Sequence, residues 1–158
     1  MALLIHVYDP TDRPADQVYT WEALAQLDRG LRYPTVHVRT MGQTGYAKAL
    51  EHYWLIPGDL VICEQDIVPG LSRFNELVAC EQPFCAFDYN LSHGVPWSSC
   101  EGSVGFGLSK ISEGARRAVR ATPKVPQTGH RDMPGLLSER LPTVHVHYPL
   151  VEHYHGRA

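Results

Sequence analysis

The amino-acid sequence predicts an α/β fold, with a mostly parallel sheet flanked by helices, in one compact domain over residues 1–158. Short apolar runs rich in β-branched residues alternate with stretches of helical periodicity. The most apolar of these runs, residues 60–63, ends directly before an acidic pair. A chain of 158 residues, 44% of them hydrophobic and 20% charged, has the length and composition of one soluble domain.

Overall charge and hydropathy do not point to a nucleic-acid or a membrane partner. The net charge of −3 provides no overall attraction to nucleic acid or to a membrane surface. No apolar run approaches the roughly 20 residues of a membrane span. Residues 1–6 lack the charged region and the long apolar region of a signal peptide. We therefore expect a cytoplasmic protein without a membrane partner.

The four cysteines are Cys63, Cys80, Cys85 and Cys100, and none of their spacings is C-x-x-C. The sequence therefore suggests neither a zinc knuckle nor a redox pair. Cys63 and Cys85 lie in apolar runs, so we expect them to be buried thiols in a reducing compartment. A disulfide between Cys80 and Cys85 is the alternative.

The first elements along the chain predict a parallel unit. Residues 2–8 form an apolar run that a polar loop with two prolines, residues 9–16, follows. Residues 20–30 carry a capping threonine, an apolar face and a final glycine, which predicts a helix. Residues 33–39 alternate and are β-branched like a second strand. Strand, helix and strand in this order favour a right-handed parallel connection.

This second strand leads into a glycine-containing loop, residues 39–48, at the start of the next helix. Glycines allow close backbone approach, and a helix start offers free N–H groups to an anion. Arg39 adds a fixed positive charge. The glycine spacing fits neither a Walker A loop nor a dinucleotide fingerprint.

The strand predicted over residues 60–63 is followed by Glu64 and Asp66. Residues i and i+2 of an extended backbone point the same way, so both carboxylates face one spot. Open α/β sheets bind their ligands at the carboxyl ends of strands. Two hard oxygen donors there suit Mg²⁺ or Mn²⁺ bound to phosphates. A solvated strand end or turn is the alternative.

The middle of the chain continues the alternation of helices and strands. Residues 69–80 are predicted to be a helix and residues 82–87 the next strand. The polar and aromatic loop over residues 88–97 is long enough to suggest a function, and Trp97 is suited to stacking on a sugar or base. A cover for the sheet edge is the alternative. Residues 103–110 contain glycines that let the backbone approach a ligand closely.

A basic stretch follows, with five basic residues and one acid, Glu113. The basic residues are Lys110, Arg116, Arg117, Arg120 and Lys124. A solvated helix face explains this stretch, and contact with the phosphates of a nucleic acid is the alternative.

The last third of the chain offers a carboxylate and a group of histidines. Asp132 precedes a short helix predicted over residues 133–141, where it is suited either to capping that helix or to taking a proton from a hydroxyl. The tail holds four of the nine histidines, which are His145, His147, His153 and His155. Histidines are common metal ligands. A zinc site made of these histidines alone is the alternative to an ion shared with Glu64 and Asp66.

These motifs, taken in order, resemble those of small phage and metavirome glycosyltransferases with the GT-A fold. Glu64-Gln65-Asp66 resembles the Asp-any-Asp motif of that family, in which the motif holds a divalent ion on the diphosphate of a nucleotide sugar. Glu64 stands where the motif usually has its first Asp, and the chain is short for this fold. Residues 151–156 are similar to the terminal element whose histidine completes the coordination of the ion, and His153 is preferred over His155.

The resemblance implies roles for individual residues. The metal ligands, for Mn²⁺ or Mg²⁺, would be Glu64, Asp66, His153 and His155. The residues implicated in donor binding are Tyr8, Asp9, Pro10, Arg39, Gln43, Glu64, Gln65, Gly105 and Gly107. Asp132 matches the acid that approaches the acceptor and would act as the catalytic base if the reaction inverts configuration.

The expected activity is transfer of a sugar, from a UDP-sugar in the first instance, to a hydroxyl on a phage macromolecule in the host cytoplasm. The basic stretch favours a hydroxymethylated pyrimidine in DNA as the acceptor, with a Ser or Thr of a virion protein as the alternative. Two rivals from other classes are open. One is a metal-dependent phosphoester hydrolase that uses the same carboxylates and histidines. The other is a non-catalytic nucleic-acid-binding module.

Overall fold

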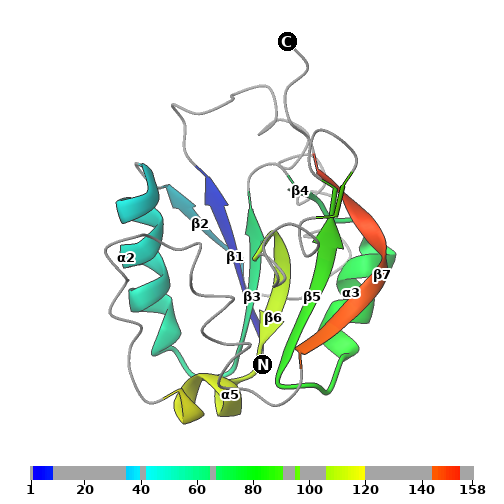
Figure 1. Ribbon diagram of the computed structural model, residues 1–158. Coiled ribbons are helices and arrows are strands. Elements are labelled where there is room, and N and C mark those ends of the chain that lie inside the picture. Colours follow the sequence, from blue (N-terminus) through cyan, green and yellow to red (C-terminus); the bar gives the residue numbers. More distant parts are fainter. Residues whose placement is uncertain are drawn as a thin grey trace.

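Figure 1 shows the computed structural model, which describes residues 2–8, 35–39, 42–64, 67–90, 95–96, 106–119 and 144–153. Its strands are β1 (Ala2–Tyr8), β2 (Thr35–Arg39), β3 (Asp59–Glu64), β4 (Ile67–Val68), β5 (Phe84–Tyr89), β6 (Leu108–Ile111) and β7 (Val144–His153). Its helices are α2 (Gly42–Trp54), α3 (Leu71–Ala79) and α5 (Glu113–Ala118).

The described strands form one sheet in the order β2-β1-β3-β6-β5-β7-β4. Strand β1 pairs in parallel with β2 and β3, and β5 pairs in parallel with β7. Strand β6 is antiparallel to both of its neighbours, β3 and β5, and β4 is antiparallel to β7. Strands β2, β1, β3, β5 and β7 therefore run in one direction, which confirms the predicted α/β fold with a mostly parallel sheet.

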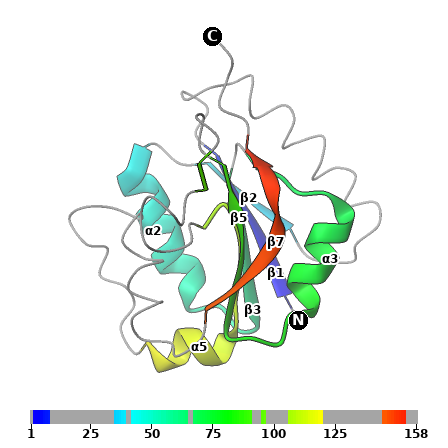
Figure 2. The same ribbon diagram turned by 45° about the vertical axis from the view of Figure 1, so that its right-hand side comes forward.

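Helices cover both faces of this sheet, with α2 and α3 on opposite sides (Figure 2). Alternate residues of each strand face the two layers. The face toward α2 and α5 (the α2 face) buries, among others, Ile5, Leu60, Ile62, Phe84 and Ala86 against Leu50 and Trp54. The opposite face (the α3 face) buries Leu4, Val61, Cys63, Cys85 and Phe87 against Phe74 and Leu77.

Strand β3 lies at the centre of both layers. Its residues 60–63 are each no more than 1% exposed, which confirms the prediction of a fully buried strand. Because both faces of this strand are covered, the sequence shows a continuous apolar run rather than an alternation.

Two strands differ from the sequence prediction. Strand β4 has only two residues, which is too few for an apolar pattern to be recognised in the sequence. It is a strand because its backbone pairs with that of β7. Strand β5 continues through Asp88 and Tyr89, which the sequence placed in a loop, and both residues are buried. The helices predicted over residues 20–30 and 133–141 lie outside the described residues.

Cys80 and Cys85 form a disulfide, so the expectation that Cys85 is a free thiol is wrong. Cys80 directly follows α3, and Cys85 is the second residue of β5, so the short return from helix to strand brings their sulfurs together. Cys63 is a buried thiol that is not part of a disulfide, as expected.

Helix α5 closes the amino edge of the sheet, at the turn that leads into β3. Gly58 in this turn has a φ of 91°, a conformation that side chains with a Cβ rarely adopt. Its N–H donates to Oε2 of Glu113 at 2.7 Å. The guanidinium of Arg116 donates to four backbone carbonyls, which are those of Tyr53, Trp54, Ile56 and Gly58.

Candidate active site

The candidate active site lies at the opposite edge, where the parallel strands have their carboxyl ends, at the top of Figure 1. Strand β3 ends there at Glu64, whose side chain is half-buried. In the parallel register Glu64 lies beside Val7 of β1, one residue before that strand ends. Gln65 and Asp66 lie outside the described residues, so the structure places the first acid of the motif and the strand that carries it.

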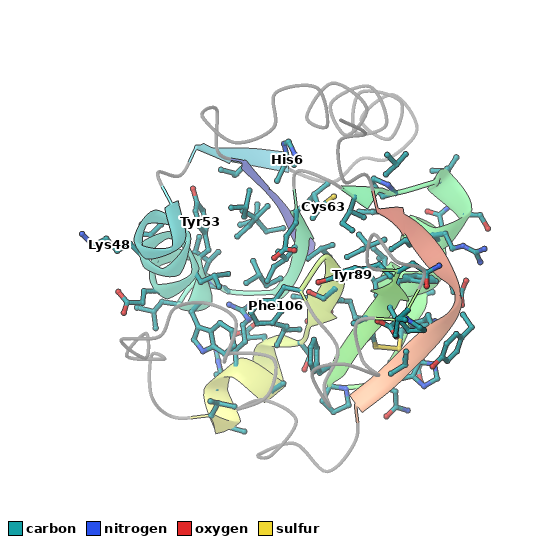
Figure 3. The ribbon with its side chains drawn as sticks, turned by 45° about the horizontal axis from the view of Figure 1, so that its top comes forward. His6, Lys48, Tyr53, Cys63, Tyr89 and Phe106 are labelled. Carbon is teal, nitrogen blue, oxygen red and sulfur yellow. A yellow bond between two sulfur atoms is a disulfide. The ribbon has the colours of Figure 1, made fainter. Side chains whose placement is uncertain are left out.

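Gly107 is held directly beside the acidic motif. The N–H of Glu64 donates to the carbonyl of Gly107 at 2.8 Å. A Cβ at position 107 would lie 2.6 Å and 2.9 Å from two ring carbons of Tyr89, and 3.1 Å from Cδ1 of Ile67. Any side chain at position 107 would therefore collide with the ring of Tyr89, so this position requires a glycine. Tyr89 is itself 5% exposed, and it is labelled in Figure 3, where the carboxyl edge is turned forward.

The terminal strand reaches the same place. In the antiparallel pair of β4 and β7, Ile67 is the partner of His153 and Val68 is the partner of Glu152. The backbone of His153 therefore lies opposite the residue that directly follows Asp66. Val151 of β7 is buried with Ile67 and Tyr89, which fixes this end of β7 against the rest of the edge.

Asp88 is a carboxylate at this edge that the sequence analysis did not single out as a site residue. Leu108 of β6 pairs with Cys63 of β3 and with Phe87 of β5, and both pairs are antiparallel. The residue before Leu108, which is Gly107, therefore lies between the residues that follow Cys63 and Phe87, which are Glu64 and Asp88. Strand alternation predicts that both side chains lie on the α2 face. Asp88 is fully buried, and its Oδ1 accepts from the N–H of Tyr89 at 3.0 Å. This hydrogen bond makes Asp88 a group that holds the backbone at Tyr89. The signal for it was an apolar run that ends in an acid, as at Glu64.

The other predicted donor-binding residues are placed only in part. The backbones of Tyr8 and Arg39 are partners at the carboxyl ends of β1 and β2, and Gln43 lies in the first turn of α2. The structure therefore brings the backbones of Tyr8, Arg39, Gln43, Glu64, Gly107 and His153 to one edge of the sheet. The predicted site residues that lie outside the described residues are Asp9, Pro10, Gln65, Asp66, Gly105, Asp132 and His155.

The basic stretch is only partly a solvated face where the structure describes it. Lys110 and Arg116 are each 4% exposed, and burial lowers the pKa of both side chains. Nζ of Lys110 donates to the carbonyls of Val78 and Cys80. Arg117 is exposed and pairs with Glu113. The expectation of a solvated basic face is wrong for Lys110 and Arg116, because backbone carbonyls take up their charges. Residues 120–124 lie outside the described residues.

Comparison with known proteins identifies the fold. No family model and no curated protein matches the sequence. A glycosyltransferase involved in glycosylation of the major capsid of PBCV-1 superposes with a TM-score of 0.54 at 11% identity, covering 92% of this chain and 81% of that one. The 4-diphosphocytidyl-2C-methyl-D-erythritol synthase of Anaerococcus prevotii superposes with a TM-score of 0.53 at 7% identity, covering 96% of this chain and 87% of that one.

At these identities the likeness concerns the fold, and the chain therefore has a GT-A-like α/β fold, as the sequence motifs implied. Among the described residues, no helix is long and apolar enough to cross a membrane.

Proposed function

We propose that the chain is a glycosyltransferase that moves a sugar from a nucleoside diphosphate sugar, a UDP-sugar in the first instance, to a hydroxyl on a macromolecule. The observation that carries this proposal is the meeting of three segments at one edge of the sheet. These are the acidic segment at Glu64, the glycine segment at Gly107 and the end of β7 at His153. A fold shared with a glycosyltransferase and a nucleotidyl-transferring enzyme supports a transferase with a nucleotide-linked donor.

The residues at this edge fit a divalent cation, Mn²⁺ or Mg²⁺. Glu64 is half-buried at the end of β3, and His153 pairs with Ile67, the residue that follows Asp66 in the sequence. Carboxylate oxygens suit both ions, and histidine is a common metal ligand. We propose Glu64, Asp66 and His153 as the ligands, with His155 as the alternative histidine. Such an ion, when bound, offsets the negative charge of a leaving diphosphate.

The remaining donor contacts follow from the elements that end at this edge. Tyr8, with Asp9 and Pro10 after it, is proposed to hold the base and ribose. Arg39 and Gln43 are proposed to contact the diphosphate beside the start of α2, where free backbone N–H groups favour an anion. Gln65 lies between the two acids and is proposed to touch the same donor. Gly107, with Gly105, would let the sugar approach the backbone.

In the transfer step a base takes the proton of the acceptor hydroxyl while its oxygen bonds to the anomeric carbon. The bond from that carbon to the diphosphate oxygen breaks, and the nucleoside diphosphate leaves with the electron pair. We propose Asp132 as the base for an inverting reaction.

For the acceptor, the described residues now favour a protein hydroxyl over DNA. The DNA acceptor depended on the basic stretch, and backbone carbonyls engage Lys110 and Arg116 inside the protein. The neighbour with the GT-A-like fold takes part in glycosylation of a capsid protein. We therefore propose a Ser or Thr of a virion protein as the acceptor, and hydroxymethylated DNA as the second acceptor to be tested.

The first test is calorimetric titration of UDP into the wild-type protein and Asp66→Ala, each with and without Mn²⁺. We expect binding that requires both the ion and Asp66. The matched control is Glu113→Gln, which removes a carboxylate at the opposite edge and is expected to leave UDP binding unchanged. Binding of neither UDP nor any other nucleoside diphosphate would overturn the proposal, and binding without Mn²⁺ that survives Asp66→Ala would remove the metal from it.

The second candidate function is nucleotidyl transfer, which the likeness to the erythritol synthase favours. The two reactions release different products. A glycosyltransferase with a UDP-sugar releases UDP, whereas a nucleotidyltransferase with a nucleoside triphosphate and a sugar phosphate releases pyrophosphate. A phosphoester hydrolase would consume the donor with no acceptor present. Incubation with each substrate set, with UDP, pyrophosphate and phosphate measured, separates the three.

A further inference from the structure

A second group of metal-ligating side chains lies at the amino end of β5, on the α3 face, away from the candidate active site. Cys80, Cys85 and His147 each offer a ligand atom, and these atoms all lie within 4.8 Å of one another. Cys85 is fully buried, His147 is 7% exposed, and Cys80 is half-buried. The two sulfurs form a disulfide in this structure.

His147 has the hydrogen-bond pattern that is common among metal-bound histidines. Its Nδ1 lies 2.9 Å from Oε1 of Glu76 on α3, and its ring stacks on Phe87 with a centroid distance of 5.0 Å. Its buried Nε2 has no hydrogen-bond partner among the described residues. A carboxylate that accepts from Nδ1–H leaves the lone pair of Nε2 available to an ion. A buried polar nitrogen without a partner is costly, which calls for an explanation.

We propose that the reduced protein binds Zn²⁺ through the thiolates of Cys80 and Cys85 and the imidazole of His147. Two cysteines separated by four residues, with a histidine from elsewhere in the chain, are within the ligand spacings of zinc sites. His145 is exposed, and its ring centroid lies 4.5 Å from that of His147, so it is a candidate for a fourth ligand.

The charges around the site favour this assignment. Two thiolates balance the charge of the zinc ion. Around them lie the ammonium of Lys110, which bonds to the carbonyl of Cys80, and Glu76, which contacts both His147 and Arg73.

The disulfide must be reduced before Zn²⁺ binds, and a dithiol such as dithiothreitol is a suitable reductant. The reductant gives two electrons and two protons to the disulfide, which becomes two thiols, and is itself oxidised to a cyclic disulfide. Binding of Zn²⁺ then releases the two thiol protons. The disulfide and the metal site are therefore alternative states of the same two cysteines. Their place at the amino end of β5 makes this inference independent of the proposed transferase activity.

The test uses Co²⁺ as a spectroscopic substitute for Zn²⁺ in the reduced full chain, in the Asp66→Ala background so that the candidate active site does not compete. We expect one Co²⁺ per chain, with visible bands of a tetrahedral ion and a thiolate-to-metal charge-transfer band. Added Zn²⁺ should displace it. Cys85→Ser and His147→Ala should abolish or strongly weaken binding, and Glu76→Gln should weaken it about 10–100-fold.

The control is Cys63→Ser, which removes a buried thiol on the same face and should leave the spectrum unchanged. Cys80→Ser, at a half-buried position, serves if Cys85→Ser fails to fold. Reduced protein that binds no Co²⁺, or a thiolate spectrum that survives both the Cys80 and His147 substitutions, would overturn the proposal and leave the disulfide as the only role of this pair.

Discussion

The two edges of the sheet are built in different ways. At the amino edge, charged side chains are buried and bonded to backbone, as in Arg116 with its four carbonyls and Lys110 with two. At the carboxyl edge, Glu64 is half-buried at the end of β3, beside a glycine that has no space for a side chain. The difference is consistent with a stabilising role for the amino edge and with the ligand site that we propose at the carboxyl edge.

Arg116 supplies hydrogen-bond donors to backbone carbonyls at the end of α2 and in the turn that follows it. The last carbonyls of a helix have no partner within it, and α2 ends at Trp54, directly before the turn at Gly58. A guanidinium presents several donors in a planar fork, so one side chain satisfies carbonyls from both the helix end and the turn. The amino edge is therefore a cap made by a residue from another part of the chain.

The largest effect on stability is expected for Arg116→Ala, which removes that cap. Arg116→Ala should lower the free energy of unfolding by about 3 kcal/mol, because several buried carbonyls lose their donor. Its neighbour Arg117 is the matched control, since its side chain is 77% exposed and forms a surface pair with Glu113. Arg117→Ala should change stability by less than about 1 kcal/mol. Urea unfolding measures both variants, and similar losses for the two would contradict the difference between buried and exposed arginines.

The next largest effect is expected for Gly107→Ala at the carboxyl edge. Gly107→Ala places a Cβ against the ring of Tyr89, and the strain should cost about 1–3 kcal/mol. Because Gly107 bonds to Glu64, UDP binding should weaken about tenfold, a loss of 1.4 kcal/mol. Calorimetry on the folded variant measures this loss.

Gly114→Ala is the control for this substitution. Gly114 lies in α5 with its nearest neighbour, Oγ of Ser112, 4.0 Å from an added Cβ. Alanine there should stabilise the protein by about 0.5–1 kcal/mol and leave UDP binding unchanged. Equal effects of the two alanines on UDP binding would argue against a ligand site beside Gly107.

The smallest effect is the pH dependence of the amino edge. The hydrogen bond from the N–H of Gly58 holds the pKa of Glu113 below its ordinary value of 4.5, and Arg117 and Arg116 act in the same direction. A carboxyl with a lowered pKa stabilises the fold fully above its unfolded pKa and loses that contribution as the pH falls through the folded value. Glu113→Gln should therefore flatten the decline of stability below about pH 4.5. Thermal unfolding across the acid range measures it, and a decline identical to that of the wild type would be inconsistent with the lowered pKa.

Local patterns were sufficient for much of the fold. The apolar run over residues 60–63 predicted a buried strand, and the alternation of strands and helices predicted the α/β class. Both predictions depend only on the spacing of apolar residues along the chain, which the sequence shows directly. The spacing of Glu64 and Asp66 and the terminal histidines suggested one shared site. The register of β4 with β7 pairs His153 with Ile67, the residue that follows Asp66 in the sequence, while the ligand role of these side chains remains a proposal.

Only the tertiary structure decided the rest, because it depends on partners far apart in the sequence. The antiparallel β6 that sets Gly107 beside Glu64 joins segments more than forty residues apart, and β4 exists only through its pairing with β7. The sequence marks Lys110 and Arg116 as charged and therefore suggests exposure, but carbonyls from α3, α2 and the turn before β3 allow their burial. Composition shows which groups need partners, and the fold decides where the partners are.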